Sequence, residues 1–188
     1  MMKTSLHRHS LGLVLALVIL NCLLLSGCGY VSWEGNVNVA DPVPDKSVGL
    51  TLSCEHSRCG YVNGQGELVI SRLYKVAKPF YERLASVYVE NVGWGVIDPK
   101  GRFVVQPTYA FIGPFSEGLA AACPDEKNLF RWVYIDRLGK TAIVLDYNVN
   151  RGFPFHDGKA WLNCPFLFSS ESKQIDRSGR VEHVILPR

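Results

Sequence analysis

The residues best suited by type and spacing to do chemistry are three repeated aspartates, Asp98, Asp136 and Asp176. Two carboxylates that face each other can act as general acid and base, as they do in glycoside hydrolysis. Each of these aspartates, however, opens a motif of the form Asp-x-x-Gly, and Asn63 opens a fourth copy. Aspartate or asparagine at the first position and glycine at the fourth are typical of type I turns. The pattern therefore favours turn formation over catalysis.

The histidines offer no stronger catalytic group. His156 stands beside Asp157, but it occupies a turn position that Ser116 holds in an earlier copy of the same segment, so a solvated loop residue is predicted. His56 and His183 have no evident partners. The chain has no G-x-S-x-G nucleophile elbow, no zinc-protease helix motif and no phosphate-binding glycine loop. We therefore predict that the chain is not an enzyme and has no cofactor.

The N-terminal segment has the pattern of an export signal. Residues 1–10 contain Lys3 and Arg8 and no acid, and residues 11–25 are apolar except for Asn21. Fifteen helical residues at about 1.5 Å each reach roughly 22 Å, short of the ~30 Å hydrocarbon core of a bilayer. A cleaved signal peptide is therefore favoured over a permanent membrane span.

The apolar run ends in Leu25-Ser26-Gly27-Cys28, which resembles the lipobox of bacterial lipoproteins. The resemblance implies cleavage before Cys28 and acylation of that cysteine, with palmitate among the expected acyl groups. Two or more acyl chains anchor a protein stably to a bilayer, whereas one does so marginally. Gly29 in place of aspartate leans toward the outer membrane of a Gram-negative envelope. The alternative is an ordinary secretory signal with an incidental cysteine.

Three regions follow from this assignment. Residues 1–27 are the predicted signal peptide, residues 28–49 a tether, and residues 50–188 the folded domain. Removal of the two basic residues of the signal lowers the formal net charge from +3 to +1. A nearly neutral chain with scattered charges lacks the electrostatic footprint of a nucleic-acid-binding protein. The predicted location is the cell envelope, where the chain is a membrane-anchored lipoprotein; if the envelope is Gram-negative, the outer membrane and its periplasmic face are favoured.

Four cysteines remain in the predicted domain, Cys54, Cys59, Cys123 and Cys164. In an exported chain they favour two disulfides, for which three pairings are open. We favour Cys54–Cys59 and Cys123–Cys164. The alternative for the first pair is a metal site built on Cys54-x-His56-x-x-Cys59, but no fourth ligand is evident nearby. No metal is predicted.

From Cys59 onward the chain repeats itself. The glycines of the four turns are spaced 35, 38 and 40 residues apart, which is typical of a repeat array. Short apolar strands on both sides of each turn predict a hairpin, and a tyrosine, a Pro-Phe pair, a second turn and a third strand follow. Each unit is therefore predicted to be a three-stranded antiparallel piece that buries an aromatic face against its neighbour.

The pattern is most complete in residues 94–122, where Trp-Gly-x-Ile-Asp-x-x-Gly precedes a tyrosine and Pro-Phe-Ser-Glu-Gly-Leu-Ala. This resembles the WG-repeat family of bacterial proteins. The resemblance extends over about residues 59–188 and implies an all-β fold of tandem repeats. It implies little about the biochemical activity of the chain. The units are about 59–93, 94–131, 132–172 and a partial one at 173–188.

The departures from the family pattern lie mostly in the outer units. Cys59-Gly60 replaces Trp-Gly in the first unit, Trp132-Val133 does so in the third, and Ser172-Lys173 in the fourth. The outer units are therefore predicted to cap the array. Cys123 and Cys164 hold nearly equivalent positions at the ends of third strands in adjacent units, and this is the reason for pairing them.

Two arrangements of the units remain open. Propellers use four-stranded blades, whereas three strands are visible in each full unit here. We favour an open, curved stack of β repeats. The alternative is a small closed, propeller-like ring, which would need residues 48–53 to donate a strand.

The candidate binding surface consists of residues that interrupt the repeat, because loops tolerate change and often carry function. Residues 124–131 form the longest insertion, and residues 166–170 form another. The candidates are Phe130, Arg131 and Phe166, with a mobile spacer as the alternative. Trp94 and Trp132 could stack on sugar or peptide rings, but their shared repeat position favours a place in the core between units.

These observations predict a lipid-anchored envelope protein whose repeats bind another protein or a cell-wall polymer. Several shallow units give an extended surface rather than a deep pocket, which suits binding more than turnover. An envelope hydrolase that uses the turn aspartates and a purely structural spacer are the alternatives. The membrane, reached through Cys28, is the first predicted partner, and no nucleic acid is expected.

Overall fold

The computed structural model of the protein describes residues 42–125, 127, 131–145, 149, 151–163 and 171–185. The predicted signal peptide and Cys28 lie outside these residues, as do Phe130, Cys164 and Phe166. All described residues belong to one unit, Val37–Arg188. Among them, no helix has the length and apolar character needed to cross a bilayer.

Antiparallel strands form nearly all of the regular structure. They join in chain order into four sheets of three or four strands, preceded by the short 3-10 turn η1 (Lys46–Val48). The first sheet contains β1 (Thr51–Glu55), β2 (Arg58–Val62) and β3 (Leu68–Tyr74); the second contains β4 (Val76–Ala77), β5 (Ala85–Val89), β6 (Gly93–Ile97) and β7 (Phe103–Tyr109). The third contains β8 (Phe111–Ile112), β9 (Leu119–Cys123), β10 (Val133–Asp136) and β11 (Thr141–Val144); the fourth contains β12 (Arg151–Gly152), β13 (Lys159–Asn163), β14 (Glu171–Asp176) and β15 (Val181–Ile185). The prediction of an all-β fold built from tandem antiparallel repeats is confirmed.

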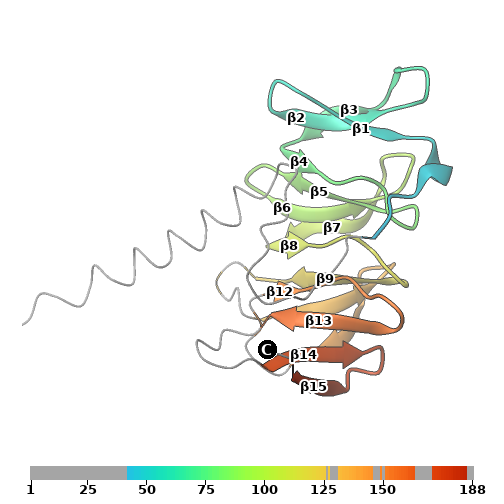
Figure 1. The fold of residues 1–188 in the computed structure, drawn as a ribbon. Helices are drawn as coiled ribbons and strands as arrows, with labels where there is room; N and C mark the ends of the chain where they lie inside the picture. Colours follow the sequence, from blue (N-terminus) through green and yellow to red (C-terminus); the bar gives the residue numbers. More distant parts are fainter. Residues whose placement is uncertain are drawn as a thin grey trace, which may run out of the picture. The chain divides into compact units, whose positions relative to one another are not determined.

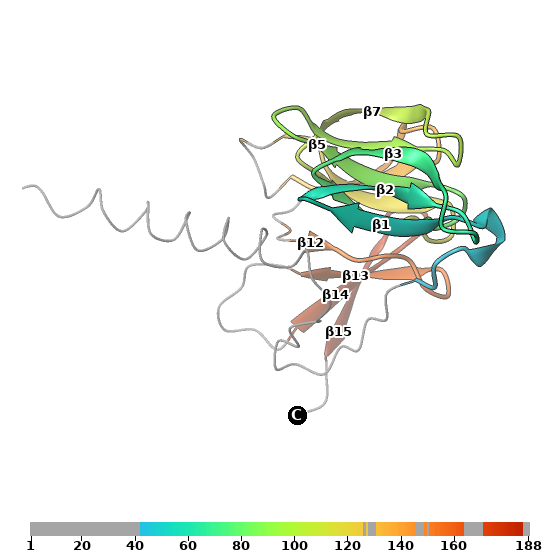
Figure 2. The same cartoon turned by 90° about the horizontal axis from the view of Figure 1, so that it is seen from above.

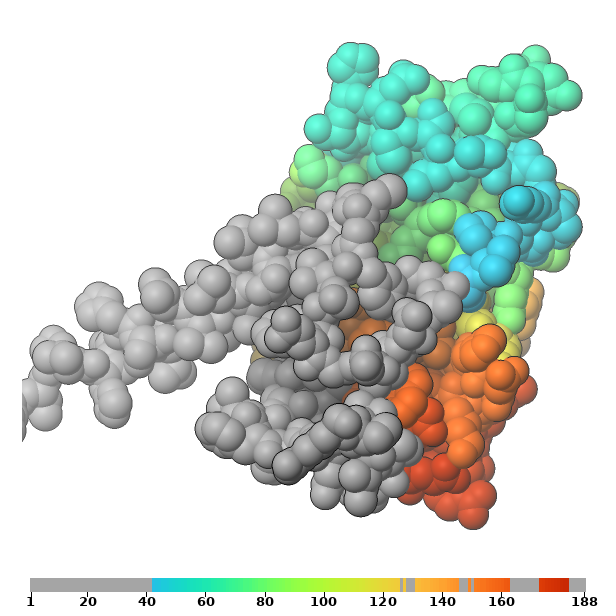
Figure 3. Space-filling view, in the orientation of Figure 1, coloured from blue at the N-terminus to red at the C-terminus, as the bar shows by residue number. Residues whose placement is uncertain are grey.

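The four sheets stack in chain order. The first and fourth sheets lie at opposite ends of the stack (Figure 1), and the same succession is visible on the surface (Figure 3). Seen from above, β14 and β15 run at a steep angle to β1 and β2, so the sheets turn relative to one another (Figure 2). Residues 51–55 do supply an additional strand, but β1 pairs with its neighbour β2. The described strands therefore form an open stack rather than a ring.

Each four-stranded sheet combines strands from two sequence units. In the second sheet, β4 and β5 come from the end of the first unit, and β6 and β7 are the hairpin of the second. The junction is the pairing of β5 with β6, in which Tyr88 lies opposite Trp94. Sheets of four strands therefore arise from units of three visible strands, because a two-residue strand is added and the sheet is offset from the repeat.

Three hydrophobic clusters fill the spaces between successive sheets. The phenylalanine of each Pro-Phe pair lies at the centre of one cluster: Phe80 between the first two sheets, Phe115 between the second and third, and Phe155 between the third and fourth. All three rings are almost completely buried. Tyr61 contacts Phe80 at 4.8 Å between ring centroids, and Tyr134 contacts Phe155 at 4.9 Å. The recurring aromatic residues therefore form the interfaces between sheets, as predicted.

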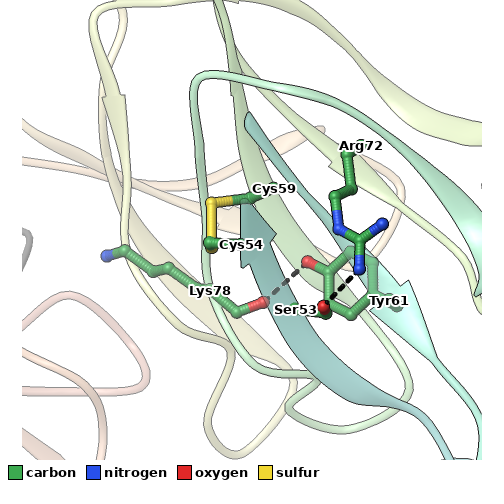
Figure 4. Close-up of a disulfide and its surroundings, with 6 residues drawn as sticks. All are labelled: Ser53, Cys54, Cys59, Tyr61, Arg72 and Lys78. Atoms are coloured by element: carbon green, nitrogen blue, oxygen red, sulfur yellow. Dashed lines mark hydrogen bonds between the residues drawn. A yellow bond between two sulfur atoms is a disulfide. The ribbon is translucent and has the colours of Figure 1, made fainter. Parts of the chain in front are cut away.

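A hydroxyl group at each interface satisfies the carbonyl that precedes the Pro-Phe pair. Tyr61 Oη donates to Lys78 O at 2.7 Å, Ser86 Oγ to Gly113 O at 2.8 Å, and Tyr134 Oη to Phe153 O at 2.9 Å. Figure 4 shows the first of these bonds. Buried carbonyls require such partners. Burial also raises the pKa of Tyr61, with a smaller contribution from Tyr74, so this hydroxyl stays protonated and can donate.

Carboxylates at the second turns link one repeat to the next. Both carboxylate oxygens of Glu82 accept the Gly118 N–H, at 3.2 and 3.0 Å. Glu117 makes the equivalent bonds with the Gly158 N–H, at 3.2 and 3.0 Å. Glu82, Glu117 and both glycines have positive φ angles. These two-residue turns therefore have the left-handed backbone typical of tight hairpins, and each carboxylate points toward the next turn of the stack.

Asp45 takes the place of this glutamate at the N-terminal end of the stack. Its Oδ2 accepts the Arg83 N–H at 3.1 Å, and its own N–H donates to Phe80 O at 2.7 Å. Arg83 stands where the later units have glycine. The segment around η1, which falls within the predicted tether, therefore caps the first interface.

Candidate functional site

The repeated aspartates bind their own turns. In every copy, Oδ1 accepts the backbone N–H groups of the residues two and four positions later, at 2.9–3.0 Å. The four copies begin at Asn63, Asp98, Asp136 and Asp176. Asparagine makes the same two bonds as aspartate, so this position needs an acceptor oxygen and not a charge. This is the geometry of the predicted turns.

Hydrogen bonding keeps two of these carboxylates ionised. In Asp176, the bond from the Ser178 hydroxyl makes the largest contribution, and the pKa is lowered to about 2. In Asp98, burial by itself would raise the pKa, but hydrogen bonds from Arg102 and from the Lys100 N–H outweigh that effect and lower it. A general acid requires a raised pKa, so that it holds its proton near neutral pH. Both carboxylates therefore have lowered pKa values and lose their proton well below neutral pH, which is the opposite of what a general acid needs.

His156 and Asp157 form an exposed pair. Nε2 of His156 lies 3.4 Å from Oδ2 of Asp157, and the two side chains are 85% and 91% exposed. The backbone N–H and C=O of His156 both bond to Lys159 across the turn. Both side chains are therefore open to solvent, as expected for residues of a solvated turn.

The predicted Cys54–Cys59 disulfide is confirmed. The two cysteines lie directly opposite each other on β1 and β2, with a Cα–Cα distance of 4.1 Å (Figure 4). His56 lies in the two-residue turn between them, where it and Ser57 have φ angles of 50° and 61°. Within the described part of the chain, no group of three His, Cys, Asp or Glu side chains could hold a metal ion. The Cys123–Cys164 pairing stays a prediction, since Cys164 lies outside the described residues.

The glycine of each Trp-Gly or Cys-Gly pair faces a bulge in the neighbouring strand. Gly95 on β6 lies between the pairs Trp94–Tyr109 and Val96–Val105, so three residues of β7 face it alone. A Cβ atom on Gly95 would lie 2.8 Å from the Val105 carbonyl oxygen. In the first sheet, Gly60 faces residues 71–73 of β3 in the same way. Only glycine allows the two backbones to approach this closely.

The third and fourth sheets lack both the glycine and this bulge. Val133 pairs with Val144 and Tyr134 with Ile143, without a shift in register between them. Lys173 likewise lies in a regular ladder of pairs between β14 and β15. The departures seen in the sequence therefore correspond to a change in the shape of the hairpin.

A row of aromatic rings crosses from the second sheet to the third. Tyr88 lies 5.8 Å from Trp94, Trp94 lies 5.4 Å from Phe111, and Phe111 lies 5.5 Å from Trp132, measured between ring centroids. Trp132 is buried and the other three rings are half-buried. The Lys78 ammonium lies 4.4 Å from the Phe111 centroid and 5.4 Å from that of Trp94. The row thus joins two sheets, and the Lys78 ammonium makes cation–π contacts with the Trp94 and Phe111 rings.

An open pocket of about 450 Å³ adjoins Tyr88 at the same boundary. Its walls come from the turn between β5 and β6, the end of β7 with the residue after it, and the segment that follows β9. The lining residues are Tyr88, Asn91, Val92, Thr108, Tyr109, Ala110, Pro124, Asp125 and Lys127. Thr108 is one of the three residues in the bulge opposite Gly95. The glycine of the repeat therefore shapes the strand that lines this pocket.

The pocket only partly coincides with the binding surface predicted from the sequence. Pro124 and Asp125 begin the predicted 124–131 insertion and do line it. Arg131 is exposed but does not line the pocket, and Phe130 and Phe166 lie outside the described residues. Asn91 and Thr108 were missed. The available signal for Thr108 was Pro107, since a proline close to a strand is typical of an edge or a bulge.

The offset sheets and their repeated contacts define a tandem β-repeat protein. The family model of the WG containing repeat matches residues 60–91 and 94–127. These two segments are therefore WG repeats, and the family resemblance is confirmed over them. They are also the two segments that begin at or just before a glycine facing a bulge.

Other comparisons add little. No curated protein matches the chain. Among solved structures, the crystal structure of the computationally designed Ika8 protein aligns with a TM-score of 0.49 at 10% identity, covering 77% of this chain and 48% of that one. The chain thus spans about half the length of the designed protein.

Proposed function

We propose that this chain is a lipid-anchored interaction module of the cell envelope, whose repeats bind a protein or a cell-wall polymer. The observation that carries the proposal is the open pocket beside Tyr88, at the boundary between two stacked sheets. Its lining residues come from segments of two successive WG repeats, as expected when an array of small units presents an extended binding surface. The lipobox-like sequence ending at Cys28 supports the membrane anchor.

A binding role is favoured over hydrolysis. Each repeated aspartate already accepts two backbone hydrogen bonds in its own turn, and the pKa values of Asp98 and Asp176 are lowered rather than raised. The exposed His156–Asp157 pair has no enclosing pocket. These features support an assignment as a non-enzymatic module.

The proposal is tested by crosslinking in intact bacterial cells that express the full chain, followed by recovery of the chain from detergent-solubilised membranes. We expect a reproducible crosslinked envelope partner and a mature N-terminus at acylated Cys28 by mass spectrometry. The Cys28→Ser variant serves as the matched control and should be absent from the acylated fraction. An unmodified N-terminus at another residue would reject the anchor. A chain that crosslinks to nothing at any crosslinker length would instead indicate a spacer.

A further inference from the structure

We propose that the pocket beside Tyr88 binds a neutral, hydroxyl-rich polysaccharide chain. This inference rests on the proposed function and names a glycan, rather than a protein, as the partner. One sugar ring would pack on Tyr88, and its hydroxyl groups would bond to Asn91 and Thr108. The pocket occurs at the boundary between the second and third sheets, where the aromatic row also crosses.

The charge of the lining favours a neutral ligand. Asp125 and Lys127 contribute one carboxylate and one ammonium group, so the lining residues that the structure describes carry no net formal charge. A site for a polyanion or polycation would present an excess of one sign. Asn91 and Thr108 add an amide and a hydroxyl, which can each donate and accept hydrogen bonds. This mixture matches the hydroxyl groups of a sugar, which also donate and accept.

The aromatic wall provides the apolar part of the site. Tyr88 is half-buried and lines the pocket, and its ring packs against Trp94 at 5.8 Å between centroids. A sugar ring has an apolar C–H face that packs on an aromatic ring while its hydroxyl groups remain available for hydrogen bonding. A proline-rich peptide would need a longer apolar groove. Among the described residues, the remaining apolar lining consists of Val92, Tyr109, Ala110 and Pro124, and the Tyr109 hydroxyl already donates to Gly139 O.

The backbone that carries the two polar side chains is ordered before any ligand arrives. Asn91 has a φ angle of 62° in the turn between β5 and β6, which the bond from Val92 N–H to Val89 O closes at 3.0 Å. Thr108 is held in the bulge of β7 opposite Gly95. Groups that are already ordered lose little conformational entropy on binding. The open form of the pocket suits one segment of a longer chain better than an enclosed small molecule.

The test is calorimetric titration of the full chain in detergent solution with chitohexaose in its fully N-acetylated form, which is a neutral oligosaccharide. We expect saturable binding that Thr108→Val and Asn91→Gly each weaken by about five- to tenfold, since each removes one or two hydrogen bonds. Valine retains the shape of threonine, and glycine tolerates the left-handed backbone of Asn91. The matched control is Thr141→Val on an exposed position of β11, which should bind as the unchanged protein does.

Two results would overturn the inference. One is the absence of chitohexaose binding, or binding that neither pocket variant weakens. The other is binding of a proline-rich peptide instead of the glycan. In either case, an envelope partner that both variants still capture by crosslinking would leave the proposed function standing. If the unchanged protein captured no crosslinked partner at all, the proposed function itself would be rejected.

Discussion

Replacement of Phe115 by alanine is expected to lower the free energy of unfolding by about 3–5 kcal/mol, the usual effect of truncating a buried phenylalanine. The ring is 1% exposed and belongs to the cluster between the second and third sheets, with Val96, Ile112 and Ile135. Part of this loss comes from the cavity that the missing ring leaves between the two sheets. Because this interface lies in the middle of the stack, its loss also weakens the connection between the two halves.

Urea unfolding followed by tryptophan fluorescence measures this effect. Trp94 packs against the Phe115 cluster, and its ring contacts Phe111 of the third sheet, so its fluorescence reports on the opening of this boundary. In a stack of repeats, a weakened interface uncouples the units on its two sides, and we expect the Phe115→Ala transition to be broader than that of the unchanged protein. The milder Phe115→Leu change should lose clearly less. A loss below about 1 kcal/mol for Phe115→Ala would contradict the packing described here.

Gly60→Ala is expected to destabilise the first sheet by about 1–3 kcal/mol, as overpacking against fixed atoms does. The new Cβ would lie against the Ile70 carbonyl oxygen and 2.8 Å from the Arg72 nitrogen. Both are backbone atoms of β3, so relief requires the strand itself to move. The paired strands β2 and β3 would have to separate in the region of the bulge.

Gly64→Ala is the matched control for this change. Gly64 lies in the turn of the same hairpin, and a Cβ placed there meets no atom within 4 Å. The substitution is expected to have little effect, or to stabilise the protein by about 0.4–1 kcal/mol through the unfolded chain. Thermal unfolding of both variants makes the comparison. Equal melting temperatures for the two would show that the close approach at Gly60 is not rigid.

The sequence allowed prediction of the parts of the fold that local chemistry determines. The Asp/Asn-x-x-Gly turns, the strands beside them and the buried Pro-Phe pairs each depend on a few neighbouring residues. The short disulfide was also within reach, because Cys54 and Cys59 are close in the chain and a hairpin turn lies between them. Repetition reinforced each of these signals, since the same pattern appeared in several units.

Long-range relations were not accessible in the same way. The pairing of Tyr88 with Trp94 offsets the sheets from the sequence units, and nothing local to either residue indicates it. Asp45 caps the stack through a bond to Arg83, a residue 38 positions away. At the middle interface, the hydroxyl that bonds the carbonyl before the Pro-Phe pair belongs to Ser86, whereas Tyr61 and Tyr134 supply it at the other two. Ser86 lies on a different strand of its unit from the two tyrosines, so an alignment of the repeats would not match the three residues.

The candidate site was the least predictable part for the same reason. Its residues come from a turn, a bulge and a loop that approach one another only when the second and third sheets stack. The interrupted repeat drew attention to residues 124 and 125, which line the pocket, but Asn91 and Thr108 belong to segments that follow the repeat closely. The position of Thr108 depends on the bulge opposite Gly95, which only the register of β6 and β7 reveals.

The central claim is that this chain works by binding and that its repeated aspartates serve its turns. The most direct test is crosslinked partner capture by the full chain carrying Asp98→Asn, Asp136→Asn and Asp176→Asn together. Asn63 makes the same two turn bonds as these aspartates, so the variant should fold, with only exposed ion pairs lost. We predict that capture is unchanged. Loss of partner capture by a variant that still folds would contradict the account, as would hydrolysis of an envelope polymer by the unchanged protein that the variant no longer performs.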